Sequence, residues 1–126
     1  MKQINILAVD DDPINLKLIE VMLKKHPNIG TLTKAMNGLE ALNIIDSDQK
    51  IDLILLDIVM PVMNGLELLD NLRSRGAKSS IPVIVLTTDE TIRREAFNKG
   101  AYDFLTKPVF EKDLIAKINE VLPLIK

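Results

Sequence analysis

The order of apolar and helix-like segments predicts an α/β fold built on one parallel sheet. Five apolar segments of strand length occur along the chain, and a segment with helical features follows each of them. The third and fourth apolar segments are continuously apolar, which is typical of strands covered by helices on both faces. Right-handed crossovers between such strands predict a three-layer sandwich of five strands and five helices.

The first two helices are marked by the residues at which they begin. Asp12 precedes Pro13, and aspartate caps a helix whose first position suits proline. This helix should run to about Lys25, with apolar residues on more than one side. The turn Asn37-Gly38 precedes the second helix. The apolar stripe of the second helix comprises Leu39, Leu42 and Ile45.

The last three helices are marked in the same way. Pro61, Asn64 and Gly65 punctuate the loop before the third helix. The fourth helix, over about Glu90–Lys99, is mostly polar, and Gly100 stops it. The fifth helix starts near Glu111. The apolar stripes are Leu66, Leu69 and Leu72 in the third helix, and Leu114, Ile118, Val121 and Ile125 in the fifth.

The strands alternate with these helices along the whole chain. Their expected positions are Ile4–Val9, Thr31–Ala35, Ile51–Leu56, Pro82–Leu86 and Tyr102–Thr106. In the flavodoxin-like strand order 2-1-3-4-5, the first and third strands lie side by side where the order reverses. The alternation alone leaves the order open, but this order would bring Asp10, Asp11 and Asp57 together.

Composition narrows the possible classes of protein. The chain has 126 residues, 47% hydrophobic and 3% aromatic, which predicts one domain over residues 1–126 with an aliphatic core. The net charge of -2 argues against nucleic-acid binding by this chain alone. Cysteine is absent and His26 is the one histidine, so thiolate and multi-histidine zinc sites are excluded. Without a membrane span or secretory signal in the sequence, we expect a cytoplasmic protein with no membrane partner.

Polar side chains stand at the carboxyl ends of four expected strands. Asp10 and Asp11 follow the first strand, Asp57 the third, Thr87 the fourth and Lys107 the fifth. The carboxyl ends of parallel strands line one crevice, where ligands bind in open α/β sheets. We therefore expect these five side chains to meet at one edge of the sheet.

The composition of this edge favours metal-assisted phosphoryl chemistry. The turn after the first strand has three aspartates and no glycine, so it would repel the bare phosphate that glycine-rich nucleotide sites bind. Clustered carboxylates suit Mg²⁺, with Mn²⁺ as a possible substitute. Asp57 is the candidate nucleophile for an acyl phosphate, while Lys107 can supply positive charge and Thr87 a hydroxyl donor.

Four stretches of the sequence carry a resemblance to a known family. They are Val9–Asp12, Leu55–Gly65, Pro82–Thr88 and Gly100–Pro108. In order and spacing, these stretches resemble the receiver domain of two-component response regulators, over essentially the whole chain. The resemblance implies a flavodoxin-like fold. It also implies that Asp57 accepts a phosphoryl group from the phosphohistidine of a sensor kinase or phosphotransfer protein.

The resemblance also implies roles for the residues around Asp57. Mg²⁺ would be held by Asp11, Asp57 and the backbone carbonyl of Val59, with Asp10 acting mainly through a bound water. Thr87 would be the switch hydroxyl and Lys107 the cation that pairs with the phosphoryl group.

Two further features follow from the same resemblance. The bond between Lys107 and Pro108 is a candidate cis peptide, and Phe104 stands at the position of the family's switch aromatic. The surface of the fourth helix, fifth strand and fifth helix is then expected to act on a downstream protein or on a missing output domain. Its exposed candidates are Arg93, Arg94, Lys99 and Tyr102.

Two other classes of function remain as alternatives. A degenerate receiver would bind partners constitutively, without phosphorylation. A Mg²⁺-dependent phosphatase with an aspartyl nucleophile would be an enzyme. The haloacid-dehalogenase type of phosphatase needs a second acid two residues after the nucleophile, where this chain has Val59. We therefore expect a signalling module, which catalyses only its own phosphorylation and dephosphorylation.

Overall fold

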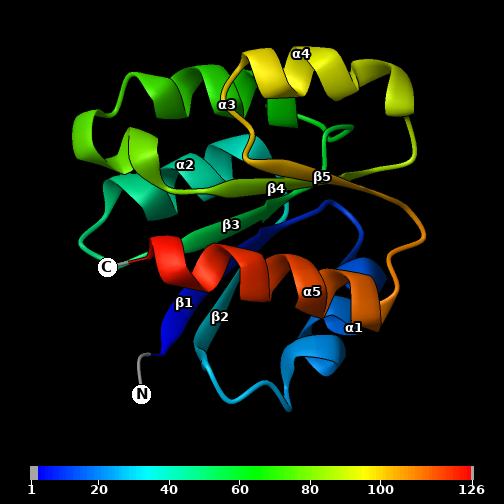
Figure 1. Cartoon of the computed structure of the whole chain (residues 1–126). Helices are drawn as coiled ribbons and strands as arrows, with labels where there is room; N and C mark the ends of the chain where they lie inside the picture. Colours follow the sequence, from blue (N-terminus) through cyan, green and yellow to red (C-terminus); the bar gives the residue numbers. More distant parts are fainter. Residues whose placement is uncertain (1–2, 126) are drawn as a thin grey trace.

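A computed structural model describes residues 3–125 as a five-stranded parallel sheet between two layers of helices (Figure 1). The strands are β1 (Ile4–Val9), β2 (Ile29–Ala35), β3 (Leu53–Leu56), β4 (Val83–Thr87) and β5 (Asp103–Thr106). Their order is β2-β1-β3-β4-β5, and every neighbouring pair is parallel. The predicted three-layer fold and the predicted strand order are therefore confirmed.

Five α-helices connect or follow the strands. They are α1 (Pro13–Leu23), α2 (Gly38–Asp46), α3 (Gly65–Arg73), α4 (Arg93–Asn98) and α5 (Glu111–Val121). Short 3-10 helices lie at Gly76–Ser80, Glu90–Ile92 and Leu122–Leu124. No helix within residues 3–125 has the length and apolar character needed to cross a membrane.

Several element boundaries differ from the prediction, including the start of β3, which lies at Leu53 instead of Ile51. The first helix ends at Leu23 instead of Lys25, and β2 begins two residues earlier than expected, at Ile29. The predicted fourth helix is divided into a 3-10 turn and the six-residue α4. Asp89 accepts hydrogen bonds from the backbone amide and the hydroxyl of Thr91, which caps the tighter turn before the α-helix begins.

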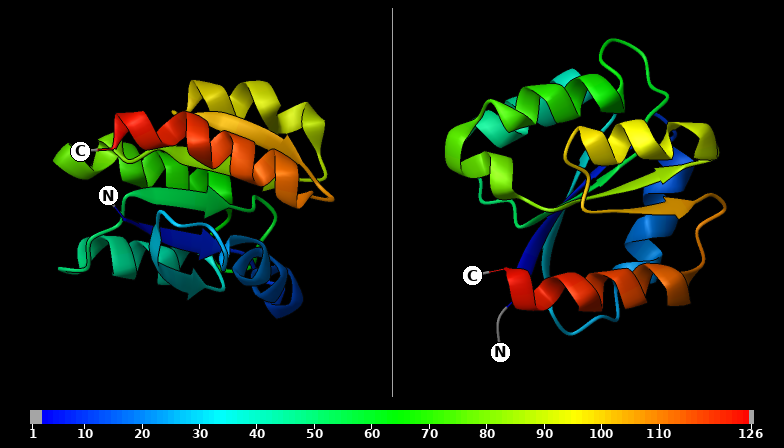
Figure 2. Two further views of the ribbon diagram at one scale, coloured as in Figure 1. Left: turned by 60° about the horizontal axis from the view of Figure 1, so that its bottom comes forward. Right: turned by 45° about the horizontal axis from the view of Figure 1, so that its top comes forward.

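The sheet separates two apolar cores. Alternate residues of each central strand point to opposite faces, so Ile54 and Leu56 pack with α2, α3 and α4, while Leu53 and Leu55 pack with α1 and α5. The views in Figure 2 show α5 on the side of the sheet away from α3 and α4. This two-sided burial explains why β3 and β4 are continuously apolar.

Helix α1 has apolar residues on two sides, as its sequence predicts. Leu16, Ile19 and Leu23 face the core. The other side stays exposed, including Ile14, Leu18 and Val21. The sheet therefore covers one face of this helix and leaves the other face uncovered.

Candidate functional site

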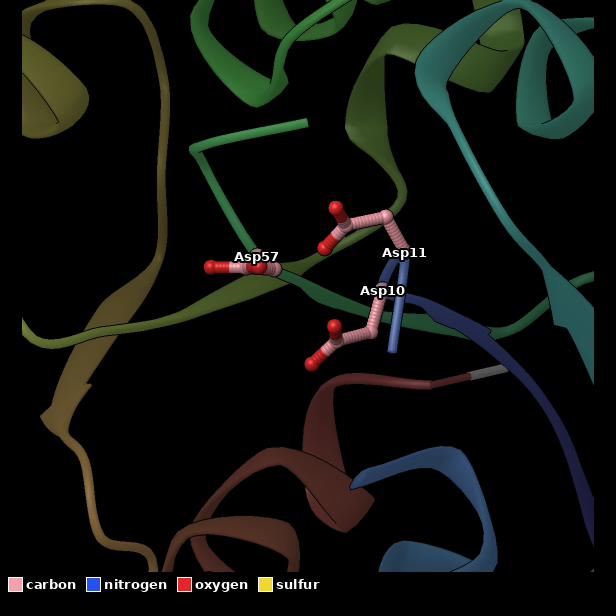
Figure 3. A group of neighbouring side chains, drawn as sticks. All are labelled: Asp10, Asp11 and Asp57. Atoms are coloured by element: carbon pink, nitrogen blue, oxygen red, sulfur yellow. The ribbon is translucent and has the colours of Figure 1, made fainter. Parts of the chain in front are cut away.

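Three carboxylates meet at the carboxyl edge of the sheet (Figure 3). Asp10 and Asp11 follow β1, and Asp57 follows β3. Because Val9 pairs with Leu56 in adjacent parallel strands, the residues after them are brought side by side. One oxygen from each carboxylate lies within 4.8 Å of the other two. The structure thus brings together the three acids that the sequence singled out.

Lys107 follows the edge strand β5, and its side chain extends to these carboxylates. Its backbone amide donates to the carbonyl of Thr87, and its peptide bond with Pro108 is cis. The Nζ atom lies 2.9 Å from Asp10 Oδ2 and 3.5 Å from Asp57 Oδ1. One ammonium therefore lies beside two of the three carboxylates.

The two oxygens of Asp57 have different surroundings. The backbone amide of Ile58 donates to Oδ1 at 2.8 Å, and Lys107 also lies nearest to Oδ1. Asp57 Oδ2 has no hydrogen-bond partner among the described residues. Because none of the buried polar side-chain atoms of these residues lacks a partner, this oxygen must be accessible to solvent. Asp57 therefore has one oxygen held in place and one that is open.

The charges at this edge shift two pKa values. Burial raises the pKa of Asp57 above its usual value and outweighs the opposing effect of Lys107. Burial alone would lower the pKa of Lys107, but the hydrogen bond to Asp10 and the charges of Asp57 and Asp10 raise it overall. The site therefore holds a firmly protonated lysine next to carboxylates that repel one another.

Asp10 and Asp11 differ in how they are engaged. Asp10 is buried, and its carboxylate accepts from Lys107 and from the amide of Asp12. Asp11 is exposed, and no hydrogen bond or ion pair of its side chain is found within residues 3–125. Each of the three carboxylates offers an oxygen as a metal ligand, and the carboxylate of Asp11 has no other partner among the described residues. This set of ligands suits a hard divalent cation such as Mg²⁺.

Thr87 and Phe104 lie on the same face of the sheet, with Thr87 at this edge and Phe104 nearer the middle of the strands. Thr87 ends β4, and its Oγ1 accepts from the amide of Asp89 at 3.3 Å. Phe104 pairs with Val85 and packs in the core under α3 and α4, where 6% of it is exposed. The aromatic ring therefore already lies inward in this structure.

The loop between β3 and α3 contains a strained turn that sequence patterns did not indicate. Val62 has φ 68°, and the amide of Met63 donates to the carbonyl of Pro61 across it. A branched side chain is disfavoured in this region. The start of α3, which follows this turn, is stabilised by a capping box that Asn64 and Glu67 form.

The expected output surface is only partly free. Arg93, Arg94 and Tyr102 are exposed. The Lys99 side chain is 24% exposed because its Nζ pairs with Asp70 of α3 at 2.8 Å. Our expectation that Lys99 is exposed is therefore wrong. The sequence did not indicate its ion pair with Asp70, because only the packing of α3 against α4 brings these two residues together.

Comparison with known proteins defines the class of this chain. Residues 6–119 match the response regulator receiver domain, and the chain belongs to that family. It is 40% identical to the protein PilH of Pseudomonas aeruginosa, over 93% of this chain and 96% of PilH. It is also 40% identical to a protein-glutamate methylesterase/protein-glutamine glutaminase of Desulfotalea psychrophila, but spans 30% of that protein's length.

Solved structures give the same family. A putative response regulator from Chloroflexus aurantiacus has a TM-score of 0.87 and 27% identity, covering 97% of this chain and 99% of that one. The receiver domain of a Pseudomonas aeruginosa sensor histidine kinase has a TM-score of 0.82 and 28% identity, covering 94% and 96%. That domain was solved with a magnesium ion coordinated in its active-site cleft. Members of this family therefore occur as separate chains and as parts of larger proteins.

Proposed function

We propose that this chain is a phosphoacceptor of a two-component system and that Asp57 takes a phosphoryl group from a phosphohistidine. The donor would be a sensor histidine kinase or a phosphotransfer protein in the cytoplasm. The observation that carries this proposal is the surroundings of Asp57. Its carboxylate lies beside Asp10 and Asp11 with an open oxygen and a lysine 3.5 Å away.

The geometry supports Asp57 Oδ2 as the attacking atom. Oδ1 is held by the Ile58 amide and lies nearest to Lys107, so Oδ2 is free to approach phosphorus. As the new O–P bond forms, the P–N bond of the phosphohistidine breaks and its electron pair returns to the imidazole. The Lys107 ammonium and the Thr87 hydroxyl can then balance negative charge on the phosphoryl oxygens.

We expect Mg²⁺ to be held by Asp11, Asp57 and the backbone carbonyl of Val59, with Asp10 acting through water. When bound, the cation would neutralise carboxylate and phosphoryl charge. Asp10 is already engaged by Lys107, which supports its less direct role. Mn²⁺, which accepts similar oxygen ligands, is expected to substitute.

The proposed output is a change in the surface of α4, β5 and α5. The phosphoryl group would draw Thr87 away from its contact with Asp89 and favour one of two arrangements of Phe104 and α4. Arg93, Arg94 and Tyr102 would then offer a changed surface to a partner protein or to an output domain. We expect no turnover of free metabolites, and we favour neither a constitutive binding module nor a phosphatase.

The direct test is phosphorylation followed by intact mass. The chain is incubated with acetyl phosphate and Mg²⁺, and we expect a mass gain of one phosphate. Asp57→Asn should lose this gain because its amide is not a nucleophile. Asp52→Asn is the matched control, since Asp52 is a buried acid at the other end of the same strand. A full gain in Asp57→Asn would contradict the proposal.

A further inference from the structure

Arg93, the first residue of α4, lies against two aromatic rings. Its Cζ atom is 5.8 Å from the ring centre of Phe97, one turn further along α4. It is 5.6 Å from the ring centre of Phe104 in β5. A guanidinium within about 6 Å of a ring is attracted by the electrons of its face. No hydrogen bond or ion pair of the Arg93 side chain is found within residues 3–125, so these rings are its contacts.

The Phe104 ring lies on the same face of the sheet as Thr87. Phe104 pairs with Val85, and Thr87 is two residues further along β4, so their side chains point to the same side. A second contact with β5 comes from the 3-10 turn just before α4, because Thr106 Oγ1 donates to Glu90 Oε1 at 2.9 Å. The start of α4 and the 3-10 turn before it are therefore attached to β5.

The other end of α4 is attached to α3. Arg73 donates from Nη1 to the carbonyl of Asn98 at 2.8 Å, and Lys99 pairs with Asp70. The two ends of α4 thus have different partners. A displacement on the β5 side would move the start of the helix while its end stays with α3.

We propose that Arg93 couples the position of the Phe104 ring to the start of α4. This inference rests on the proposed function, because phosphorylation of Asp57 is the event whose effect Arg93 would carry. When the ring of Phe104 moves, the guanidinium either follows it or loses one of its two aromatic contacts. Since Phe97 belongs to α4, following the ring moves the helix. Arg93 is a positioning residue and has no part in making or breaking bonds.

The test separates phosphoacceptance from the response of α4. Backbone amide shifts of the full chain are measured with Mg²⁺, before and after beryllium trifluoride, a mimic of the phosphoryl group. In Arg93→Gln we expect the shift changes across residues 90–98 to fall to half or less. The shift of Ile58 and the rate of phosphorylation by acetyl phosphate should stay within twofold. Arg93→Lys should be intermediate, because it keeps the charge but loses the planar group.

Two controls show whether Arg93 acts through Phe104. Arg94→Gln changes the neighbouring exposed arginine and should leave the α4 response unchanged. In a Phe104→Leu background, Arg93→Gln should have no further effect, because the ring it acts through is gone. The inference is overturned if Arg93→Gln keeps the full α4 response, or if its effect is the same in the Phe104→Leu background. Absence of an Ile58 shift in the unmodified chain would overturn the proposed function itself.

Discussion

Strand β3 has a buried aspartate just outside each end, and the two acids have different surroundings. Asp52 precedes the strand and is 7% exposed, while Asp57 follows it and is 8% exposed. The carboxylate of Asp52 accepts from the backbone amide of Asn5 at 2.9 Å, and Lys50 lies 3.8 Å away. Asp57 instead lies against two other carboxylates and shares Lys107 with one of them.

The comparison shows that equal burial leaves the two acids in different electrostatic surroundings. Asp52 uses its charge to satisfy a backbone amide where the pairing of β1 with β2 is irregular. Asp57 lies beside other carboxylates, so burial and repulsion by the charge of Asp10 raise the pKa of its carboxyl. We propose that the acid at the amino end of the strand serves stability and that the acid at its carboxyl end serves the chemistry. Three predictions test this proposal, and a fourth tests the backbone strain in the loop that follows Asp57.

The largest effect is expected on stability at Asp52. Asp52→Ala removes the acceptor of the Asn5 amide and should lower the free energy of unfolding by about 2 kcal/mol, the cost of a buried unpaired donor. Asp57→Ala should lower it by less, because a repelled charge is removed as well. Urea unfolding in metal-free buffer measures both variants, and Asp52→Asn, which retains an acceptor oxygen, should recover most of the loss. Equal losses at the two ends would break the comparison.

Metal affinity, unlike stability, should depend on the carboxylates around Asp57 and not on Asp52. Asp11→Asn should weaken Mg²⁺ binding by at least about tenfold, since even groups that only support metal ligands have effects of this size. Asp10→Asn should weaken it less, because Lys107 already engages Asp10. Asp52→Asn should leave it unchanged. Titration followed by amide shifts gives the affinities, and unchanged binding in Asp11→Asn would remove Asp11 from the metal site.

A smaller effect is expected in the pH dependence of stability without metal. Because the pKa of Asp57 is raised above its ordinary 3.8, the folded chain binds more protons than the unfolded chain above that pH. The contribution of Asp57 to stability therefore falls as the pH rises through the window from 3.8 to the folded pKa. Asp57→Asn should gain stability relative to the unmodified chain across this window, in thermal unfolding between pH 3.5 and 7. If the difference in stability between Asp57→Asn and the unmodified chain did not change with pH, the pKa of the Asp57 carboxyl would not be raised in the folded chain.

The smallest effect is expected in the loop that follows Asp57. Val62 has φ 68°, where a branched side chain is disfavoured and asparagine is tolerated. Val62→Asn should raise the free energy of unfolding by about 1 kcal/mol, because little burial is lost at this exposed position. Val59→Asn, another exposed valine of the same loop, should give no such gain. If the two variants behave alike, the strain at Val62 is negligible.

The sequence by itself determined the alternation of elements and the edge at which the polar residues meet. Strand-length apolar runs and helix starts are local patterns. Asp12 was predicted as a cap and caps α1, while Asn37 and Asn64, predicted only as turn or loop residues, cap α2 and α3. The position of an acid after a parallel strand also fixes the edge it occupies, which is why Asp57 was expected at the carboxyl edge of the sheet. The tuning of Asp57 by neighbours depends on strand order, which the alternation left open.

Tertiary structure decided the contacts between residues that are distant along the chain. Lys107 lies between two carboxylates because β5 and β1 belong to the same sheet. The pairing of Lys99 with Asp70 and the contact of Arg93 with Phe104 depend on where α4 packs. A local pattern records which face of an element is apolar. It does not record which distant side chain meets that face, because that depends on the packing of the whole sheet and its helices.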